Sequence, residues 1–226
     1  IKDTYRGRLH ANEGLIQMAG VEDNIEKFLH ADRIIIVACG TSWHAGLVAE
    51  YIFEEFARIP VEVEYASEFR YRNPIINSKD VVIAISQSGE TADTMAAIKL
   101  AKEHGAFVFG VCNVVGSSIS RESHAGAYTH AGPEIGVAST KAFTTQLLAL
   151  YLLAVSVAKR SGRISEEKEK ELLRELRHLP KALHAVLALE PQIIAWSDAF
   201  AKCENALFLG RGMHYPIALE GALKLK

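Results

Sequence analysis

The run Ser-Gln-Ser-Gly-Glu-Thr at 86–91 has the residue types of a phosphate-binding loop. It lies between an apolar segment and a predicted helix, where free backbone N–H groups, the helix dipole and hydroxyl groups can together hold a phosphate dianion without a lysine. Gly89 would let the backbone approach the ligand closely. Ser and Thr are also ordinary helix caps, but several polar side chains within one short loop favour a binding site.

Two further segments, 39–42 (CGTS) and 134–141 (EIGVASTK), could reach the same ligand. Thr41 and Ser42 follow a predicted strand and could donate to sugar or phosphate oxygens, whereas a cysteine at a strand end, here Cys39, is usually a small apolar filler. The second segment opens a long predicted helix, so its backbone N–H groups and Ser139 could face the pocket. A helix cap after the turn at Gly40, and a plain helix start, are the alternative interpretations.

Glu220 and Lys224 stand four residues apart near the end of the chain, on one face of a predicted helix. Such a pair is most often a solvated surface couple worth a few tenths of a kcal/mol. The alternative is that the pair belongs to a second pocket, because the helix follows a glycine turn.

The elements that would position these residues alternate along the chain. Strands alternating with helices of ten or more residues predict a doubly wound α/β domain, a parallel sheet with helices on both faces. Ligands of such sheets bind at the carboxyl ends of the strands, so the loops 39–42, 86–91 and 113–118 should converge on one pocket. Strands are predicted at 33–38, 61–65, 80–85, 106–112 and 126–129, and helices at 43–57, 91–104 and 137–159.

The sheet domain is expected to be one of four parts. Residues 33–54 align without gaps to residues 205–226, with Gly40 on Gly212 and Trp43 on Tyr215. We therefore expect the first strand and helix of a second, truncated copy at the end of the chain, with its strand at 206–209. The predicted parts are a helical segment (1–32, one or two helices), the first domain (33–160), a helical connector in which Pro180 and Pro191 bracket a helix (161–204), and the second copy (205–226).

Composition excludes several classes of protein. The net charge of -2 arises from 25 basic and 27 acidic residues spread along the chain, which favours neither nucleic acid nor a membrane surface as partner. The three cysteines are far apart and form no CxxC pair, so a disulfide framework and a zinc cluster are not expected and a reducing cytoplasm fits. The longest apolar run, 147–158, is shorter than the roughly 20 residues of a membrane span and predicts a buried helix.

Common cofactor and nucleophile motifs are absent from the sequence. It has no GxGxxG after the first strand, no GxxxxGK[ST], no HExxH and no GxSxG. We therefore expect no nucleotide, nicotinamide or metal cofactor. The histidines are scattered, and most are interpreted as solvent-facing or satisfied in the core.

Several sequence blocks together resemble a known family, the isomerase half of glutamine-dependent glucosamine-6-phosphate synthases, which is built from two sugar-isomerase (SIS) domains. The long block around SQSGETADT is more specific than any single loop. The blocks are ACGTS at 38–42, SEFRYR at 67–72, SQSGETADT at 86–94, EIGVASTKAFTTQ at 134–146 and LFLGRG to YPIALEGALKLK at 207–226.

The resemblance implies roles for individual residues. Lys224 would match an active-site lysine, with Glu220 as its helical neighbour, and both are candidate catalytic residues. The candidate substrate-binding residues are Cys39, Gly40, Thr41, Ser42, Ser86, Gln87, Ser88, Thr91, Val137 and Ser139.

The resemblance also implies a reaction. Fructose 6-phosphate would be aminated with ammonia from a separate glutaminase domain and isomerised by proton transfer between C2 and C1, which requires a positioned base. The partners would be a hexose 6-phosphate, the glutaminase domain and a second copy in a cytoplasmic homodimer. Further catalytic groups of the family would follow Lys226, so we expect binding by this chain without turnover.

Three other functions share the fold class. A non-catalytic sugar-phosphate sensor should carry a basic DNA-binding segment before residue 33, and residues 1–30 show none. A deglycase or isomerase acting on another sugar-amine phosphate would differ only in the selectivity of its pocket. A dinucleotide-dependent oxidoreductase lacks the glycine fingerprint here, and fold alone does not imply function.

Overall fold

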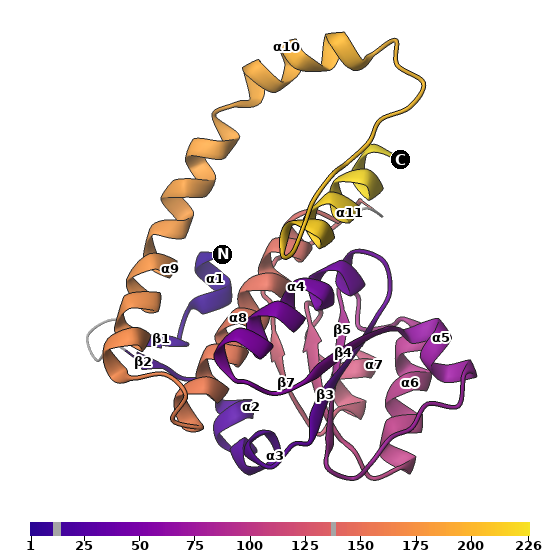
Figure 1. The fold of residues 1–226 in the computed structure, drawn as a ribbon, viewed down its shortest axis with the longest axis vertical. Coiled ribbons are helices and arrows are strands. Elements are labelled where there is room, and N and C mark those ends of the chain that lie inside the picture. Colours follow the sequence, from indigo (N-terminus) through magenta and orange to yellow (C-terminus); the bar gives the residue numbers. More distant parts are fainter. Residues whose placement is uncertain (11–14, 137–138) are drawn as a thin grey trace.

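Five segments of the chain pair into one parallel sheet in the order β4-β3-β5-β6-β7 (Figure 1). The structure, a computed structural model, describes residues 1–10, 15–136 and 139–226. Each predicted strand is confirmed to within one residue at either end. The strands are β3 (Arg33–Ala38), β4 (Val61–Tyr65), β5 (Asp80–Ser86), β6 (Phe107–Cys112) and β7 (Ala125–Tyr128).

The central strands are continuous apolar runs because both of their faces are covered. Every residue of β5 is buried, and β3 pairs with it in register, with Ile36 opposite Ile83. Runs of β-branched residues without polar alternation are typical of strands that pack against helices on two sides. The coverage of both faces therefore explains both the burial of these strands and their unbroken apolar sequences.

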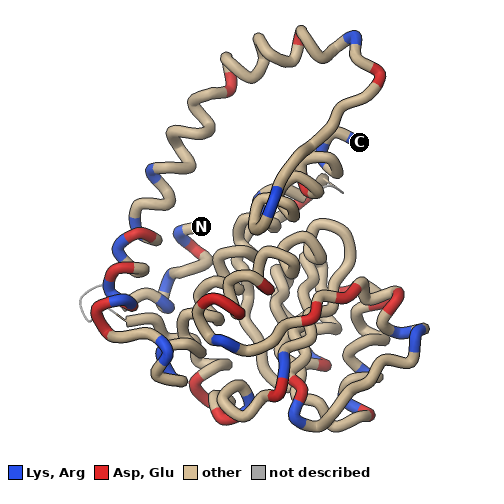
Figure 2. The backbone as a smooth tube through the Cα atoms, in the orientation of Figure 1, with Lys and Arg blue, Asp and Glu red and all other residues tan. Residues whose placement is uncertain are grey.

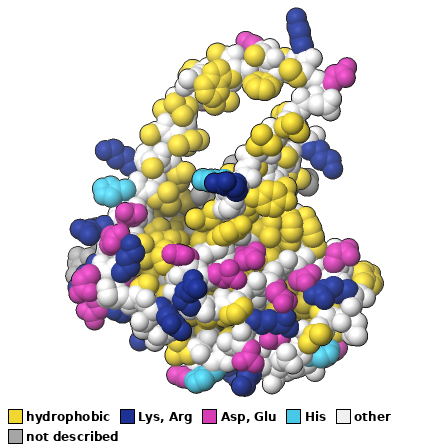
Figure 3. All heavy atoms as spheres, viewed as in Figure 1, with side chains coloured by type: hydrophobic (Ala, Val, Ile, Leu, Met, Phe, Trp, Pro, Cys, Tyr) yellow, Lys and Arg dark blue, Asp and Glu magenta, His cyan; other side chains and the backbone are white. Residues whose placement is uncertain are grey.

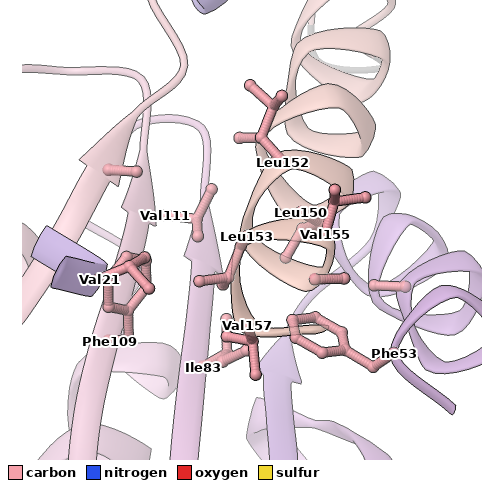
Figure 4. Packing of buried hydrophobic residues seen from close by; sticks show 14 of the residues in the cluster. Val21, Phe53, Ile83, Phe109, Val111, Leu150, Leu152, Leu153, Val155 and Val157 are labelled. Atoms are coloured by element: carbon pink, nitrogen blue, oxygen red, sulfur yellow. The ribbon is translucent and has the colours of Figure 1, made fainter. Parts of the chain in front are cut away.

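Helices cover both faces of the sheet, which confirms the doubly wound architecture. In Figure 4, Leu153 and Val157 of the longest helix on one face lie close to Ile83 and Val111 of the sheet. One face packs against α2 (Ala19–Glu22), α3 (Ile25–Leu29), α4 (Thr41–Phe56) and α8 (Lys141–Arg160), and the other against α5 (Ala66–Tyr71), α6 (Ala92–Glu103) and α7 (Ser118–Glu122). Figure 2 shows charges of both signs interspersed over this domain.

Helix α8 is long and apolar enough to cross a membrane by length and composition, but 72% of its most apolar window is buried inside the chain. It packs on the sheet beside α4, and its burial agrees with the buried helix predicted from the run at 147–158. Its apolar surface is therefore covered by protein.

The N-terminal segment differs from the one or two helices expected. It forms the short helix α1 (Lys2–Tyr5), followed by a two-stranded antiparallel pair, β1 (Leu9–His10) and β2 (Leu15–Ile16), before α2 and α3. The backbone N–H of Ile16 donates to the buried carboxylate of Glu169 at 3.0 Å. A contact with a residue so distant in sequence overrides weak local helical periodicity.

The C-terminal part of the chain, from α9 onward, forms an extended arm that returns to the sheet domain (Figure 1). It consists of α9 (Glu166–Leu187), α10 (Glu190–Phe200) and α11 (His214–Leu225). Pro180 was expected to bound a helix but lies inside α9, because one missing backbone hydrogen bond does not end so long a helix. Residues 184–215 are all exposed and include many large apolar side chains, visible as yellow spheres in Figure 3.

The expected strand at 206–209 is wrong for this structure, although the turn and helix after it are present. No described strand lies beside this segment, so its backbone has no ladder to join. Gly40 and Gly212, which the repeat aligns, both adopt the left-handed region, with φ of 55° and 57°. The repeated turn therefore forms even where its strand does not pair.

Candidate functional site

A cavity of ≈ 600 Å³ opens at the carboxyl ends of β3 and β5, where a ligand of a doubly wound sheet is expected. It brings together every described residue that the sequence analysis assigned to substrate binding. Val137 lies outside the described residues. The lining residues are Cys39, Gly40, Thr41, Ser42, Ile85, Ser86, Gln87, Ser88, Thr91, Glu134, Ile135, Gly136, Ser139 and Leu223. We call this the site cavity.

The loop 113–118 does not line the site cavity, contrary to expectation. Asn113 and Val114 instead line a neighbouring cavity of ≈ 840 Å³, which shares Gln87 and Glu134 with the first. The loop packs behind residues 86–91, since the Asn113 N–H donates to the carbonyl of Gln87 at 3.3 Å. The loop 113–118 therefore packs against the loop 86–91 without lining the site cavity.

The loop 86–91 folds around the hydroxyl of Ser86. This oxygen accepts the N–H of Gly89 at 3.0 Å and lies 3.0 Å from Oγ1 of Thr91. Gly89 has φ +69°, and a Cβ there would lie 2.0 Å from Oγ of Ser117, so both the turn and the close packing require glycine. The bonds hold the hydroxyl groups in a tight turn at the mouth of the cavity.

The N-terminus of α6 is open toward this loop. Thr91 occupies the N-cap position, yet its side chain makes no capping hydrogen bond, so ordinary capping does not explain it. Free N–H groups in the first turn carry partial positive charge and suit an anion. The Glu90 side chain does not line the site cavity. It accepts hydrogen bonds from Ser118, including one from the Ser118 N–H at 2.8 Å, and these lower the pKa of the Glu90 carboxyl.

The opposite wall is formed by the first turn of α4. Gly40 is the N-cap residue, and Thr41 and Ser42 are buried. Oγ of Ser42 accepts from Nε2 of Gln146 in α8 at 2.9 Å. Because the Ser42 oxygen is occupied as an acceptor, its proton remains available to donate to a ligand.

Glu220 and Lys224 do not form a solvated surface pair. Only 5% of Glu220 is exposed, and it packs against α4 of the sheet domain. Thr41 donates its hydroxyl to Oε1 of Glu220 at 3.1 Å, and Lys224 forms an ion pair with the same oxygen. Lys224 Nζ also lies 3.3 Å from Oγ1 of Thr41, which places the ammonium at the rim of the site cavity.

The carboxylate of Glu220 is ionised by its surroundings. Burial alone would raise its pKa, but hydrogen bonds from His44, Lys224 and Thr41 outweigh burial and lower the pKa below its ordinary value. A charged, immobile carboxylate can fix the direction of the Lys224 ammonium.

Sequence reasoning missed two residues, His44 and Gln146. His44 is buried and its Nδ1 lies 2.6 Å from Oε2 of Glu220. It follows Thr41 by three residues, so helical spacing alone would have placed both side chains on one face. Nothing in the local sequence marks Gln146, because its partner Ser42 lies in another element.

Comparisons with known proteins found relatives of this chain. The sequence pattern described as SIS domain matches residues 27–156. The chain is 58% and 55% identical, over its whole length, to the glutamine–fructose-6-phosphate aminotransferases (isomerizing) of Chlorobaculum tepidum and Bacteroides thetaiotaomicron. It spans 37% of the length of each of these relatives.

A solved structure shares the fold over nearly the whole chain. This is the C-terminal domain of glucosamine-fructose-6-phosphate aminotransferase from Francisella tularensis, with a TM-score of 0.94 and 41% sequence identity. The match covers 99% of this chain and 62% of that one.

Proposed function

Because the chain belongs to the SIS domain family, we propose that it binds a hexose 6-phosphate in the site cavity and serves as the sugar-phosphate part of a glutamine–fructose-6-phosphate aminotransferase. The observation that carries the proposal is the convergence of the 39–42 and 86–91 loops and Ser139 on one cavity. The volume of ≈ 600 Å³ lies within the range of small-molecule sites, about 300–1,000 Å³.

The phosphate is assigned to the loop 86–91. Ser86, Ser88 and Thr91 supply hydroxyls there, and the first turn of α6 supplies free N–H groups. A phosphate monoester carries nearly two negative charges at neutral pH, so the positive end of a helix dipole suits it. The carboxylate of Glu134, which also lines the cavity, accepts the N–H of Ala142 at 2.9 Å and is partly neutralised by the start of α8.

The sugar is assigned to the wall formed by α4 and α11. Ser42 can donate its proton to a hydroxyl or carbonyl oxygen, and Lys224 brings a cation to the rim. An ammonium held by a carboxylate can stabilise negative charge that develops on a substrate oxygen during proton transfer between neighbouring carbons. We assign this electrostatic role to Lys224 and the holding role to Glu220.

The wider reaction extends the proposal to partners. Fructose 6-phosphate would receive ammonia released from glutamine by a glutaminase domain, giving glucosamine 6-phosphate, in a cytoplasmic homodimer. Support comes from the names of the relatives, which are aminotransferases acting on glutamine and fructose 6-phosphate. For the chain by itself we propose binding without turnover.

Calorimetric titration of the purified chain with glucosamine 6-phosphate tests the binding proposal, with glucose and inorganic phosphate as separate controls. We expect saturable binding that needs sugar and phosphate in one molecule. Ser86→Ala should weaken it about tenfold or more, the usual cost of losing a hydrogen bond to a charged group. Ser197→Ala, on the exposed face of α10, is the matched control and should bind like the wild type. Absence of binding by the wild type contradicts the proposal.

A further inference from the structure

His44 is a buried polar residue that binding of a sugar phosphate does not by itself require. It lies in the first turns of α4, and its ring is not among the groups that line the site cavity. Its Nδ1 faces α11, where it meets Oε2 of Glu220 at 2.6 Å. The contact links residues 176 positions apart in sequence.

The carboxylate of Glu220 has three donors arranged around it. Thr41 and Lys224 occupy Oε1, and His44 occupies Oε2. Without His44, Oε2 would have no partner among the described residues, although only 5% of Glu220 is exposed. An unpaired oxygen of a buried carboxylate is costly, so removing the ring should loosen the packing of α11 on α4.

Lys224 is the more exposed partner in this cluster, with 27% of its side chain exposed against 7% for Glu220. Its ammonium contacts both Glu220 and Thr41, so its position depends on how firmly the carboxylate is held. Leu223, the residue before Lys224 on α11, lines the site cavity. Any shift of α11 therefore changes one wall of the cavity and moves the cation at its rim.

We infer that His44 is a positioning residue: by donating Nδ1–H to Glu220 it seats α11 on α4 and thereby holds the Lys224 ammonium at the rim of the site cavity. The inference rests on the proposed function only in giving the cavity a sugar-phosphate ligand. The seating of α11 is a property of the unliganded chain and can be measured without any ligand.

Hydrogen exchange of α11, followed by mass spectrometry on the unliganded chain, tests the seating. His44→Ala should accelerate exchange of the α11 amides by at least about tenfold, since a hydrogen bond to a charged group exceeds the 1.4 kcal/mol that corresponds to this factor. His44→Asn should restore slow exchange, because its amide nitrogen stands at the same position along the side chain as Nδ1. His104→Ala, an exposed histidine at the end of α6, is the matched control.

Titration with glucosamine 6-phosphate then tests the consequence for the site. His44→Ala should bind about tenfold more weakly or worse, with His44→Asn close to the wild type. Unchanged α11 exchange in His44→Ala, or no rescue by His44→Asn, overturns the inference, and so does unchanged binding by His44→Ala. If the wild type binds no sugar phosphate, the proposed function fails instead, and the exchange data still decide whether His44 seats α11. Should His44→Ala fail to fold, comparing His44→Asn with His44→Gln gives the same test, because only Asn places its N–H at the required distance.

Discussion

Nδ1 of His44 lies 2.6 Å from Oε2 of Glu220, so a buried polar contact joins α4, the helix after β3, to α11 at the end of the arm. This contact makes one wall of the site cavity depend on a segment that is distant in sequence. The charge of Glu220 is therefore important for both the stability of the fold and the geometry of the site.

Acid should release this contact. The folded pKa of Glu220 is lowered from its ordinary value of 4.5, so its contribution to the free energy of unfolding is complete above 4.5 and is lost as pH falls through the folded pKa. Urea unfolding between pH 7 and pH 3.5 should show a shallower pH dependence for Glu220→Gln than for the wild type. Glu103→Gln, an exposed residue of α6, should keep the wild-type slope. Parallel profiles for the wild type and Glu220→Gln would contradict the prediction.

Two glycines with nearly the same positive φ allow the cost of backbone strain to be measured separately from the cost of a steric clash. Gly89 and Gly116 have φ of +69° and +72°, but only at Gly89 does an added Cβ meet a neighbour, Oγ of Ser117 at 2.0 Å. Gly116→Ala should cost about 1–2 kcal/mol of unfolding free energy from strain. Gly89→Ala should cost about 1–3 kcal/mol more through overpacking and should also abolish sugar-phosphate binding. Adding Ser117→Gly should recover most of the excess; equal losses at the two glycines would refute the assignment.

Gln146 should trade stability against binding. Its Oε1 is buried without a hydrogen-bond partner among the described residues, while its Nε2 donates to Ser42. Gln146→Met removes the unpaired oxygen, so the free energy of unfolding should stay the same or rise. It also frees the Ser42 hydroxyl to turn away, so affinity for glucosamine 6-phosphate should fall. Calorimetry and urea unfolding on the same variant measure both effects, and a parallel loss of the two would mean a purely structural role.

Asp80 should affect stability alone. It is the first residue of the central strand β5, at the amino ends of the strands and so remote from the site, and the Arg33 guanidinium contacts both of its oxygens, at 3.2 and 3.1 Å. Asp80→Asn leaves this buried pair incomplete and should cost about 3 kcal/mol in urea unfolding. Affinity for glucosamine 6-phosphate at a temperature where the variant is folded should equal that of the wild type. Weakened binding there would show that the two ends of the sheet are coupled.

The sheet could be predicted from sequence because its central strands are short apolar runs bounded by polar turns, whereas the edge strand β4 alternates valine with glutamate. The same reasoning failed where structure depends on distant partners. The β1 and β2 pair is held in part by Glu169, and residues 206–209 have no neighbouring strand within the described part of the chain. Pro180 shows a different limit, since a proline signals a possible helix end but does not impose one.

The candidate site was predictable in its loops but less so in its supports. Serines, threonines and glycines that directly follow predicted strands indicate a pocket by their residue types and positions. His44 and Gln146 became recognisable only when α11 and α8 were placed against α4, because each acts through a residue more than a hundred positions away. The ordinary interpretation of Glu220 and Lys224 as a surface pair failed for the same reason.

The exposed arm makes α11 a tethered ligand of its own domain. Residues 184–215 are all exposed, so in this chain they connect α11 to the sheet domain and give it a high effective concentration near α4. Cutting the arm, for example by trypsin at exposed Lys202 or Arg211, would turn the docking of α11 into a bimolecular equilibrium. The sheet domain could then stay folded while one wall of its site was lost on dilution.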